Sequence, residues 1–466
     1  MKTENYDKEL SYWIEKEKTT SELSNVVNRL ILEHATELVM FRNRMTHITI
    51  SEILNLHDYA AKFVKQDISV HQTLPLAKAI LELGIKNAKI DLGKLAYKWN
   101  KEGYSNDKIN DFVKIKLSAF IKSENNLAPK DVILYGFGRI GRLVARELFL
   151  QDNAGGQLRL RAIVTRSNSK KDISKRASLL RTDSVHGIFT GTVKENYENK
   201  ALLINGRTVN MIAAKSPDTI DYTDYGIQDA LVIDNTGVFR DEEALSLHLK
   251  SKGVAKVLLT APGKGVPNIV FGVNQKTLKN SDHIISAASC TTNCLAPVAY
   301  VLNENFEIEK GFMTTIHAFT SDQRILDNSH KDPRRARSAS QSIVPTSTGA
   351  SKAIGEIIPS LKGKLEGIAM RVPTPNVSLV ELVFCTKKDL SIEKINSAFQ
   401  NFNKKNKILK ITKEKLVSID FNHNPASSIV DASLTNVVGK NMGKISAWYD
   451  NEWGFSNRMC DIAEYL

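Results

Sequence analysis

The sequence predicts an α/β fold class in three parts: an all-helical N-terminal extension, a parallel-sheet domain, and an α+β domain with a mainly antiparallel sheet. Three observations lead to this prediction. The chain has 466 residues, which is too long for one typical domain. Residues 1–127 carry apolar side chains at helical spacing, with few glycines or prolines. From Asp131 onward, short apolar runs alternate with amphipathic stretches, as they do where strands alternate with helices.

The composition is ordinary for a globular protein. Hydrophobic residues make up 42% and charged residues 25% of the chain. No apolar run approaches the roughly 18 residues that span a membrane, and the polar start MKTENYDKELSYWIEKEK differs from a secretory signal. The 4 cysteines are too few for a disulfide framework and favour a reducing compartment. We therefore expect a cytoplasmic protein with no membrane partner.

The formal net charge of +13 indicates an anionic partner. The lysines and arginines are spread along the chain, and no basic tract is interleaved with aromatic residues as in a nucleic-acid groove. We therefore expect anionic small molecules as ligands, and no dedicated nucleic-acid site.

The extension, residues 1–127, is predicted to be a helical module of unknown role. Its polar end, residues 122–130, is closed by Pro129. Its histidines are scattered and suit surface or core positions better than a site. The apolar residues that recur at helical spacing are Leu23, Val26, Val27, Leu30, Ile31, Leu38, Val39, Phe41, Leu76, Ile80, Leu83, Leu92, Leu95 and Ala96.

A glycine-rich turn follows the first strand of the second part. The buried strand 132–135 leads directly into Gly136-Phe-Gly138-Arg-Ile-Gly141, and an amphipathic helix follows. In this context the G-x-G-x-x-G motif binds a dinucleotide, because the glycines allow a tight turn and a close approach to the pyrophosphate at the helix N-terminus. The motif predicts a Rossmann-type dinucleotide-binding domain over residues 128–289.

The later strands of this domain end in residues that suit the same ligand. The second strand, 158–164, leads into Arg166 without the carboxylate that would bind the ribose of NAD, which favours NADP unless Arg166 is only a solvated strand end. Two further strands run into Thr236-Gly237 and Thr260, at the edge where open parallel sheets bind ligands. Ordinary loop chemistry explains each of these ends about equally well.

Cys290 is the candidate nucleophile. It stands after a short apolar run and before a segment with helical apolar spacing, so the pattern predicts a helix that begins at Cys290. A thiol there meets free N–H groups and the positive end of the helix dipole, which favour the thiolate. A buried structural thiol is the common alternative. Cys294, one turn later, has no further Cys/His cluster beside it, so we expect no metal.

His317 is the candidate base. It lies near the end of an apolar segment, residues 311–320, and could instead be a core histidine. A cysteine that handles an aldehyde needs a group that removes and returns protons near neutral pH, which the imidazole does.

Three arginine or hydroxyl groups after His317 are candidate anion sites. The polar loop 321–345 contains Arg337 among other arginines, which could clamp phosphates or lie in water. Thr348 and Gly349 open a helix, whose N-terminus attracts anions. Arg371 follows an apolar segment and supplies a fixed charge.

The third part is predicted to be the catalytic domain, residues 290–450. Its strands at 378–386 and 428–432 suggest a mainly antiparallel sheet. A last amphipathic helix, within residues 451–466, completes the dinucleotide-binding domain.

Seven segments, in chain order, resemble phosphorylating glyceraldehyde-3-phosphate dehydrogenase: GFGRIGR, SCTTNC, TTIHAFTSDQ, SHKDPRRAR, TSTGASKAIG, RVPTPNVS and WYDNEWGFS. They cover nearly all of residues 131–466, whereas residues 1–127 have no counterpart in the family's usual chain. The resemblance implies oxidation of glyceraldehyde 3-phosphate with inorganic phosphate through a thioester, in glycolysis or gluconeogenesis, by a homotetramer.

The resemblance also implies a role for each matched residue. Cys290 would attack the aldehyde as a thiolate, and His317 would be its general base. Cofactor binding would fall to Arg139 and Ile140 along the pyrophosphate and to Asn451 at the nicotinamide carboxamide. The substrate phosphate would meet Thr320 and Arg371. Inorganic phosphate would meet Ser289, Thr291, Thr348 and Gly349, with Arg337 nearby.

Four departures from the family pattern bear on the cofactor. Tyr135 stands where the family usually has Asn, and Phe455 where it has Tyr. The usual acidic residue after the second strand is absent. Asn328-Ser329 replaces the usual Leu-Pro, and a serine there resembles NADP-accepting photosynthetic members. The last two departures agree, so we predict that NADP is used, alone or beside NAD.

Two other functions fit the same residues. An erythrose-4-phosphate dehydrogenase would use the same nucleophile on a longer sugar. A catalytically silent scaffold would bind nucleotide or nucleic acid through the basic extension. For the extension itself the hypotheses are an oligomer contact, a cover over the cofactor cleft, and a partner-docking bundle.

Overall fold

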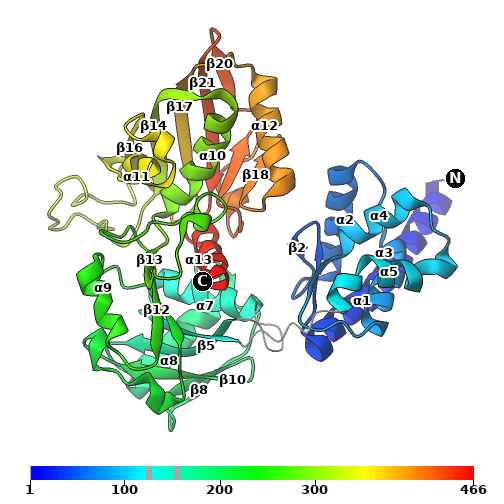
Figure 1. Cartoon of the computed structure of the whole chain (residues 1–466), viewed down its shortest axis with the longest axis horizontal. Coiled ribbons are helices and arrows are strands. Elements are labelled where there is room, and N and C mark those ends of the chain that lie inside the picture. The colour runs from blue at the N-terminus through cyan, green and yellow to red at the C-terminus, as the bar shows by residue number, and fades with distance from the viewer. Residues whose placement is uncertain (1, 122–128, 152–157) are drawn as a thin grey trace. The chain divides into compact units, whose positions relative to one another are not determined.

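The computed structural model describes residues 2–121, 129–151 and 158–466 (Figure 1). The chain divides into two compact units, residues 1–129 with 150–159 and residues 130–149 with 160–466. The predicted end of the extension, at residue 127, lies outside the described residues. No helix in the described part is both long and apolar enough to cross a membrane.

The extension is built from helices around one apolar core. Most of the apolar residues predicted from helical spacing are buried there, among them Leu23, Val27, Leu30 and Ile80. The helices are α1 (Lys2–His34), α2 (Ile50–Val64), α3 (Val70–Glu82), α4 (Leu92–Glu102), α5 (Ile109–Lys116) and α6 (Ser118–Ile121), with the 3₁₀ turn η1 (Asn106–Lys108).

The prediction of an all-helical extension is corrected by a small three-stranded sheet. Its strands are β1 (Glu37–Met40), β2 (Asn43–Arg44) and β3 (Lys89–Asp91), in the order β2-β1-β3. Leu38 and Val39, assigned to a helix by their spacing, lie in β1. An apolar run of this length cannot be told from a buried helix segment by periodicity, which explains the error.

The second unit begins with an eight-stranded sheet of the predicted dinucleotide-binding type. Its order is β13-β12-β11-β4-β5-β10-β9-β8, and β11 pairs in parallel with both β4 and β12. The strands are β4 (Lys130–Tyr135), β5 (Leu158–Thr165), β8 (Val193–Asn196), β9 (Ala201–Ile204), β10 (Arg207–Ala213), β11 (Ala230–Asp234), β12 (Val254–Leu259) and β13 (Ile284–Ser286).

Helices and short elements accompany this sheet (Figure 1). The helices are α7 (Arg139–Gln151), α8 (Lys170–Arg181) and α9 (Glu242–Leu249). The short elements are β6 (Thr182–Asp183), β7 (Gly187–Ile188), η2 (Pro217–Thr219), η3 (Tyr222–Tyr225) and η4 (Gln275–Thr277).

A second eight-stranded sheet is mainly antiparallel, as predicted. Its path is β15-β16-β14-β17-β21-β19-β18, with β20 on β21, and β14 pairs in parallel with β16. The strands are β14 (Ile308–Ala318), β15 (Val344–Ser347), β16 (Leu365–Val372), β17 (Ser378–Thr386), β18 (Leu409–Thr412), β19 (Ser428–Asp431), β20 (Asn436–Val438) and β21 (Met442–Tyr449).

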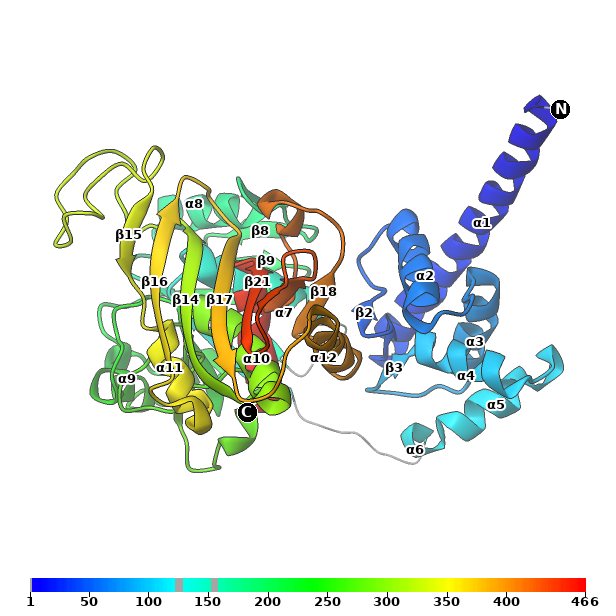
Figure 2. The ribbon, with the colours of Figure 1, turned by 90° about the horizontal axis from the view of Figure 1, so that it is seen from above.

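One face of this sheet is covered by helices, as Figure 2 shows. Leu295, Val298 and Leu302 of α10 (Cys290–Phe306) belong to the same buried cluster as Leu382 of β17. The other elements are α11 (Ala350–Ile357), α12 (Ile392–Lys405), η5 (Pro359–Leu361) and η6 (Ser418–Phe421).

The C-terminal helix α13 (Trp453–Tyr465) returns to the first sheet. Lys130 of β4 donates to the Ala463 carbonyl at 3.3 Å, and Lys256 of β12 donates to the Leu466 carbonyl at 3.1 Å. The two sheets are thus held together by the end of the chain, and Cys290 lies where the first sheet passes into the second.

Candidate active site

Cys290 is the first residue of α10, as predicted. The Ser289 hydroxyl caps the helix by accepting the N–H of Thr292 at 3.0 Å. Ala288 holds a left-handed backbone conformation (φ 57°), which turns the chain sharply before the cysteine. Its N–H donates to the Ser286 hydroxyl at 3.0 Å, and this bond stabilises the turn. Strand end, turn and helix start together fix the position of the sulfur.

His317 and Arg371 lie beside Cys290 on neighbouring strands. β14 and β16 pair so that His317 stands opposite Arg371. The His317 Nε2 lies 3.5 Å from the Cys290 Sγ, and its Nδ1 lies 2.6 Å from the Arg371 Nη1. His317 is only 3% exposed. In the structure the predicted nucleophile therefore contacts the predicted base, and the base contacts the predicted fixed charge.

Burial controls the protonation of this group. It raises the pKa of the Cys290 thiol, while the charge of Arg371 opposes that rise. Burial, and next the charge of Arg371, lower the pKa of His317 to about 3. The helix start, which favours the thiolate, and burial of the sulfur therefore act in opposite directions on the pKa of Cys290. The lowered pKa of His317 favours the neutral imidazole near pH 7, which is the form that can accept a proton.

Two contacts compete for the Nδ1 of His317. The Arg371 Nη1 donates toward it at 2.6 Å, which requires an unprotonated Nδ1, and the Ala318 carbonyl lies at 2.6 Å, which requires a protonated one. Arg371 also donates to that carbonyl at 3.0 Å. A base acting through Nε2 must carry its proton on Nδ1, so the Ala318 contact corresponds to the reactive tautomer and the Arg371 contact to the other.

The side chain of Thr291 is turned into the protein. Its hydroxyl lies 2.9 Å from the Tyr449 hydroxyl, which is also 2.9 Å from the Thr315 hydroxyl. Burial raises the pKa of Tyr449 above its ordinary range, so the phenol stays protonated and one of these oxygens accepts from it. Tyr449 lies in the WYDNEWGFS segment, but sequence reasoning gave it no role because its partners Thr291 and Thr315 are distant in sequence.

Asn451 is tied to the same site by a serine. The Ser378 hydroxyl donates to the Asn451 Oδ1 at 2.8 Å and accepts the Ala318 N–H at 3.0 Å. Val377, just before it, has φ 67°, which is a strained conformation for a β-branched residue. Ser378 thus joins the end of the His317 strand to the predicted nicotinamide residue.

The predicted dinucleotide residues line the ends of parallel strands. Gly136 has φ 93°, and a Cβ there would lie 2.9 Å from the Thr236 side chain. A Cβ on Gly141 would lie 2.5 Å from the Gly136 carbonyl, whereas one on Gly138 would meet no atom within 4 Å. Gly136 and Gly141 are thus needed for packing. Gly138 leaves open space before α7, which fits a pyrophosphate at this helix start.

A buried acid–histidine pair holds the next strand end. The Asp234 Oδ1 accepts the N–H and hydroxyl of Thr236, both at 2.7 Å, and its Oδ2 lies 3.0 Å from the His248 Nε2. The hydroxyl of Thr260 donates to the Asp234 carbonyl at 3.0 Å. Tyr135, which replaces the family's usual asparagine, packs edge-on against His248 at 4.7 Å between ring centres. The tyrosine ring therefore fills space behind the turn and leaves the glycine geometry intact.

The side chain of Arg139 is occupied by carboxylates. Its Nε and Nη2 donate to Glu452 at 2.5 and 2.6 Å, and it also contacts Asp183 at 3.3 Å. Only the backbone of Arg139 and Ile140, at the start of α7, is therefore available to a pyrophosphate. Arg166, after β5, is exposed beside the space where a ribose would lie in this fold.

The loop arginines are placed differently from the prediction. Arg337 pairs with Asp327 at 2.8 Å on the surface, where its side chain is 69% exposed. Arg335 instead donates to the Thr346 hydroxyl at 3.0 and 2.8 Å and to Asp322 at 2.6 Å. Thr346 lies on β15, next to the Arg371 strand. Arg335 is therefore the loop arginine directed to the sheet, and three similar residues in RRAR could not be ranked by sequence.

The other predicted phosphate residues lie at element ends. Thr320 follows β14, and its N–H points to the Gln323 side chain at 3.4 Å. Thr348 accepts the Ala350 N–H at 3.2 Å at the start of α11, and Gly349 precedes that helix. Among the described residues, no cluster of three or more His, Cys, Asp or Glu side chains has metal-binding geometry.

Comparison with known proteins identifies both halves of this unit. A model of the glyceraldehyde 3-phosphate dehydrogenase NAD binding domain matches residues 130–242, and one of the C-terminal domain matches residues 289–451. Glyceraldehyde-3-phosphate dehydrogenase of Zymomonas mobilis is 45% identical over 340 residues, 72% of this chain and 98% of that protein. The chloroplastic enzyme GAPA1 of Arabidopsis thaliana is 46% identical over 342 residues, 73% of this chain and 84% of its own.

One relative also matches the extension. A glyceraldehyde-3-phosphate dehydrogenase-like protein of Pseudomonas aeruginosa is 44% identical over 421 residues, 88% of this chain and 91% of that protein. Residues 130–466 make up less than three quarters of the chain, so this match includes part of residues 1–129. The chain belongs to the glyceraldehyde-3-phosphate dehydrogenase family, nicotinamide-dependent oxidoreductases that act on an aldehyde.

Proposed function

We propose that the protein oxidises glyceraldehyde 3-phosphate to 1,3-bisphosphoglycerate, with Cys290 as the nucleophile and inorganic phosphate as the second substrate. The observation that carries this proposal is the 3.5 Å contact between the Cys290 Sγ and the His317 Nε2, with Arg371 on the far side of the imidazole. A nucleophile, a base that can take its proton, and a fixed charge for a phosphorylated substrate are what the reaction needs.

The first step joins Cys290 to the aldehyde. Arg371 and Thr320 bind the substrate phosphate, and His317 takes the thiol proton through Nε2. The sulfur then adds to the aldehyde carbon, and the resulting oxyanion is held by N–H groups at the start of α10 and by the protonated imidazole. The imidazolium returns its proton to the oxyanion, so the adduct is a neutral thiohemiacetal on Cys290 and His317 is again able to accept a proton.

Oxidation and phosphorolysis complete the reaction. The nicotinamide supplies a hydride acceptor, and the glycine turn, Thr236, Thr260 and Asn451 would hold the dinucleotide. His317 accepts the hydroxyl proton as the thiohemiacetal becomes a thioester. Inorganic phosphate, bound by Ser289, Thr348, Gly349 and a loop arginine, then attacks the carbonyl carbon. The hydroxyl of Thr291 is directed to Tyr449, so Thr291 would offer the phosphate its backbone N–H. The Cys290 thiolate leaves, and the oxidation energy is retained in an acyl phosphate.

Replacement of Cys290 tests the assignment. Cys290→Ser should abolish phosphate-dependent reduction of the cofactor by glyceraldehyde 3-phosphate, while dinucleotide binding, measured by titration calorimetry, is unchanged. Cys385→Ser, on the outer side of β17, is the matched control and should keep full activity. Substantial turnover by Cys290→Ser would contradict the proposal. Comparison of kcat/KM on erythrose 4-phosphate and on the triose tests the choice of substrate.

We also propose that NADP is accepted, alone or beside NAD. Arg166 is exposed after β5, and its cation can pair with a ribose 2′-phosphate. Arg166→Asp should lower kcat/KM for NADP by at least about tenfold relative to NAD, the equivalent of one lost charged contact. A wild-type preference for NAD above about a hundredfold, or an unchanged ratio in the variant, would count against this proposal.

A homotetramer in the cytoplasm is the proposed working form. Apolar side chains such as Phe312 and Ile368, 52% and 37% exposed, lie on the outer face of the second sheet and suit a subunit contact. The cytoplasmic proposal rests on the low cysteine content. Light scattering of the full chain tests the subunit number, and fractionation of cells tests the compartment.

A further inference from the structure

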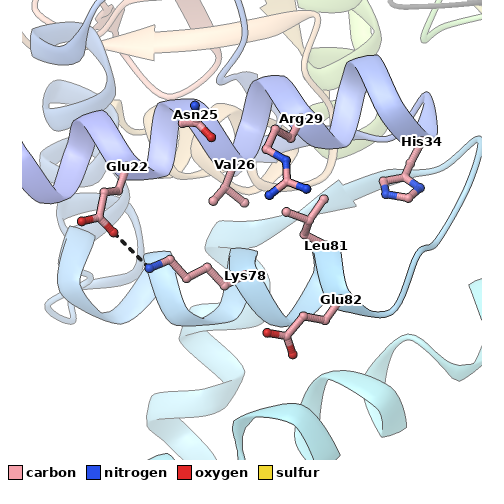
Figure 3. A pocket seen from close by; sticks show the side chains of 8 residues that line it. All are labelled: Glu22, Asn25, Val26, Arg29, His34, Lys78, Leu81 and Glu82. Carbon is pink, nitrogen blue, oxygen red and sulfur yellow. Dashed lines mark hydrogen bonds and ion pairs between the residues drawn. The ribbon is translucent and has the colours of Figure 1, made fainter.

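The extension contains a hollow that does not qualify as a ligand site. It lies between α1 and α3 and is lined by Glu22, Arg29, His34, Lys78 and Glu82, among others (Figure 3). Its charges are already paired within the extension: Lys78 with Glu22 at 3.0 Å, Arg29 with Glu33 at 2.8 Å, and Glu82 with Asn110 at 3.2 Å. Of these three contacts, the Lys78–Glu22 pair joins α1 to α3, the Arg29–Glu33 pair lies within α1, and the Asn110–Glu82 bond joins α5 to α3.

The first half of α1 has no such support. Residues 6–15 are all exposed, whereas Leu23, Val27 and Leu30 in the second half are fully buried. Figure 2 shows the N-terminal part of α1 projecting beyond the other helices of the extension. A free helical segment of about 12 residues is marginally stable in water. This segment nevertheless exposes large apolar side chains, including Trp13 at 44% and Leu10 at 43%. In the single chain, this segment therefore leaves apolar surface exposed that a partner could cover.

The exposed apolar residues form a stripe. Tyr6, Leu10, Trp13 and Ile14 are spaced as i, i+4, i+7 and i+8, so they fall within about 100° of the helix circumference. Tyr12 lies off this stripe, where Lys16 covers its ring at 4.8 Å. This spacing is typical of a helix that packs lengthwise against another helix.

The stripe is self-complementary when two copies run in opposite directions. With the two-fold axis between residues 11 and 12, Leu10 faces Trp13 of the second copy, and Tyr6 faces Glu17. On one flank Glu9 then lies beside Lys16 of the second copy, and on the other flank Asp7 lies beside Lys18. All these flanking contacts join opposite charges, which is how coiled coils select partner and direction.

We propose that residues 6–18 of α1 pair antiparallel with the same residues of a second copy of this chain. The extension thereby acts as an oligomer contact outside the dehydrogenase unit. The paired face buries Leu10 and Trp13, the kind of large anchors that dominate helix interfaces, and the flanking charges set the direction. This inference stands on α1 alone and is independent of the proposed activity.

Disulfide trapping in the full chain tests the pairing. Glu9→Cys and Lys16→Cys together place thiols on the same flank, each beside the other residue of the second copy. The matched control combines Lys8→Cys with Glu15→Cys, which have the same seven-residue separation on the opposite side of the helix. Mild oxidation followed by non-reducing electrophoresis measures covalent dimers, and the unmodified chain gives the background from the native cysteines.

The proposal expects a reducible dimer with E9C/K16C and only background with K8C/E15C. Adding Leu10→Asp to E9C/K16C should remove the dimer while the far-UV circular dichroism and the melting temperature show that the chain is still folded. Equal cross-linking of the two cysteine pairs would overturn the proposal, and so would a dimer that persists with Leu10→Asp. The charge reversal Glu9→Lys should weaken assembly, and adding Lys16→Glu should restore it; failure of the restoration would also overturn antiparallel self-pairing.

Discussion

Replacing Arg371 by methionine should make the Cys290 thiol harder to ionise. The path from the sulfur through the imidazole to the Arg371 Nη1 is at most about 8 Å, from contacts of 3.5 and 2.6 Å at its two ends. A unit charge at about 8 Å and an effective dielectric of about 20 stabilises a thiolate by about 2 kcal/mol. Its loss raises the thiol pKa by about 1.5, which leaves about 30-fold less thiolate at neutral pH.

Alkylation by iodoacetamide measures this effect without substrate. The neutral reagent reacts with the thiolate, so at pH 7 the Arg371→Met variant should react about 30-fold more slowly than the wild type, by the same shift in thiol pKa. The two rates should converge at high pH, where both thiols are ionised. Arg337→Met removes a surface guanidinium of the same kind and should leave the rate unchanged. Equal rates at pH 7 for Arg371→Met and the wild type would refute the electrostatic argument.

Three further outcomes follow from the packing and charge of the site. The pKa of His317 in the folded protein is about 3, below its ordinary 6.5, so the unfolded chain binds the proton first as the pH falls. Between pH 7 and 4.5 the wild type should therefore lose about 2.5 kcal/mol more free energy of unfolding than His317→Asn, as measured by urea unfolding. Gly138→Ala should keep stability but weaken dinucleotide binding, whereas Gly141→Ala should also lower the melting temperature, because only its Cβ meets backbone. Leu302→Ala in the core should cost about 2–5 kcal/mol and Leu179→Ala on the surface less than about 0.5 kcal/mol in the same assay.

Sequence periodicity predicts the parts of the fold where each segment has one dominant pattern. The strand at 230–234 and the helix start at Cys290 lie where they are expected, because a fully buried strand and a capped helix leave clear signals. The β8–β9–β10 meander was not predicted, since its strands are short and partly exposed. The sheet in the extension was missed for a similar reason.

The candidate site is predicted less completely than the fold. Motifs identify Cys290, His317 and Arg371, but only coordinates show which neighbours hold them. Arg335 and Arg337 have the same chemistry and nearly the same sequence context, and the contact with Thr346 separates them. Ser378 and Tyr449 lie within the RVPTPNVS and WYDNEWGFS segments, but their hydrogen bonds join strands that are distant in sequence, so the motifs alone assign them no role.

The competition at the His317 Nδ1 connects substrate binding with activation of the nucleophile. In the free site Arg371 donates to Nδ1, and burial together with the Arg371 charge lowers the pKa of the imidazole. A phosphorylated substrate provides a stronger acceptor for the guanidinium and cancels part of its charge. Nδ1 can then hold a proton against the Ala318 carbonyl, and Nε2 is free to accept the thiol proton. On this reasoning Arg371 recognises the phosphate, and until the phosphate is bound it holds His317 in the tautomer that cannot take the thiol proton through Nε2.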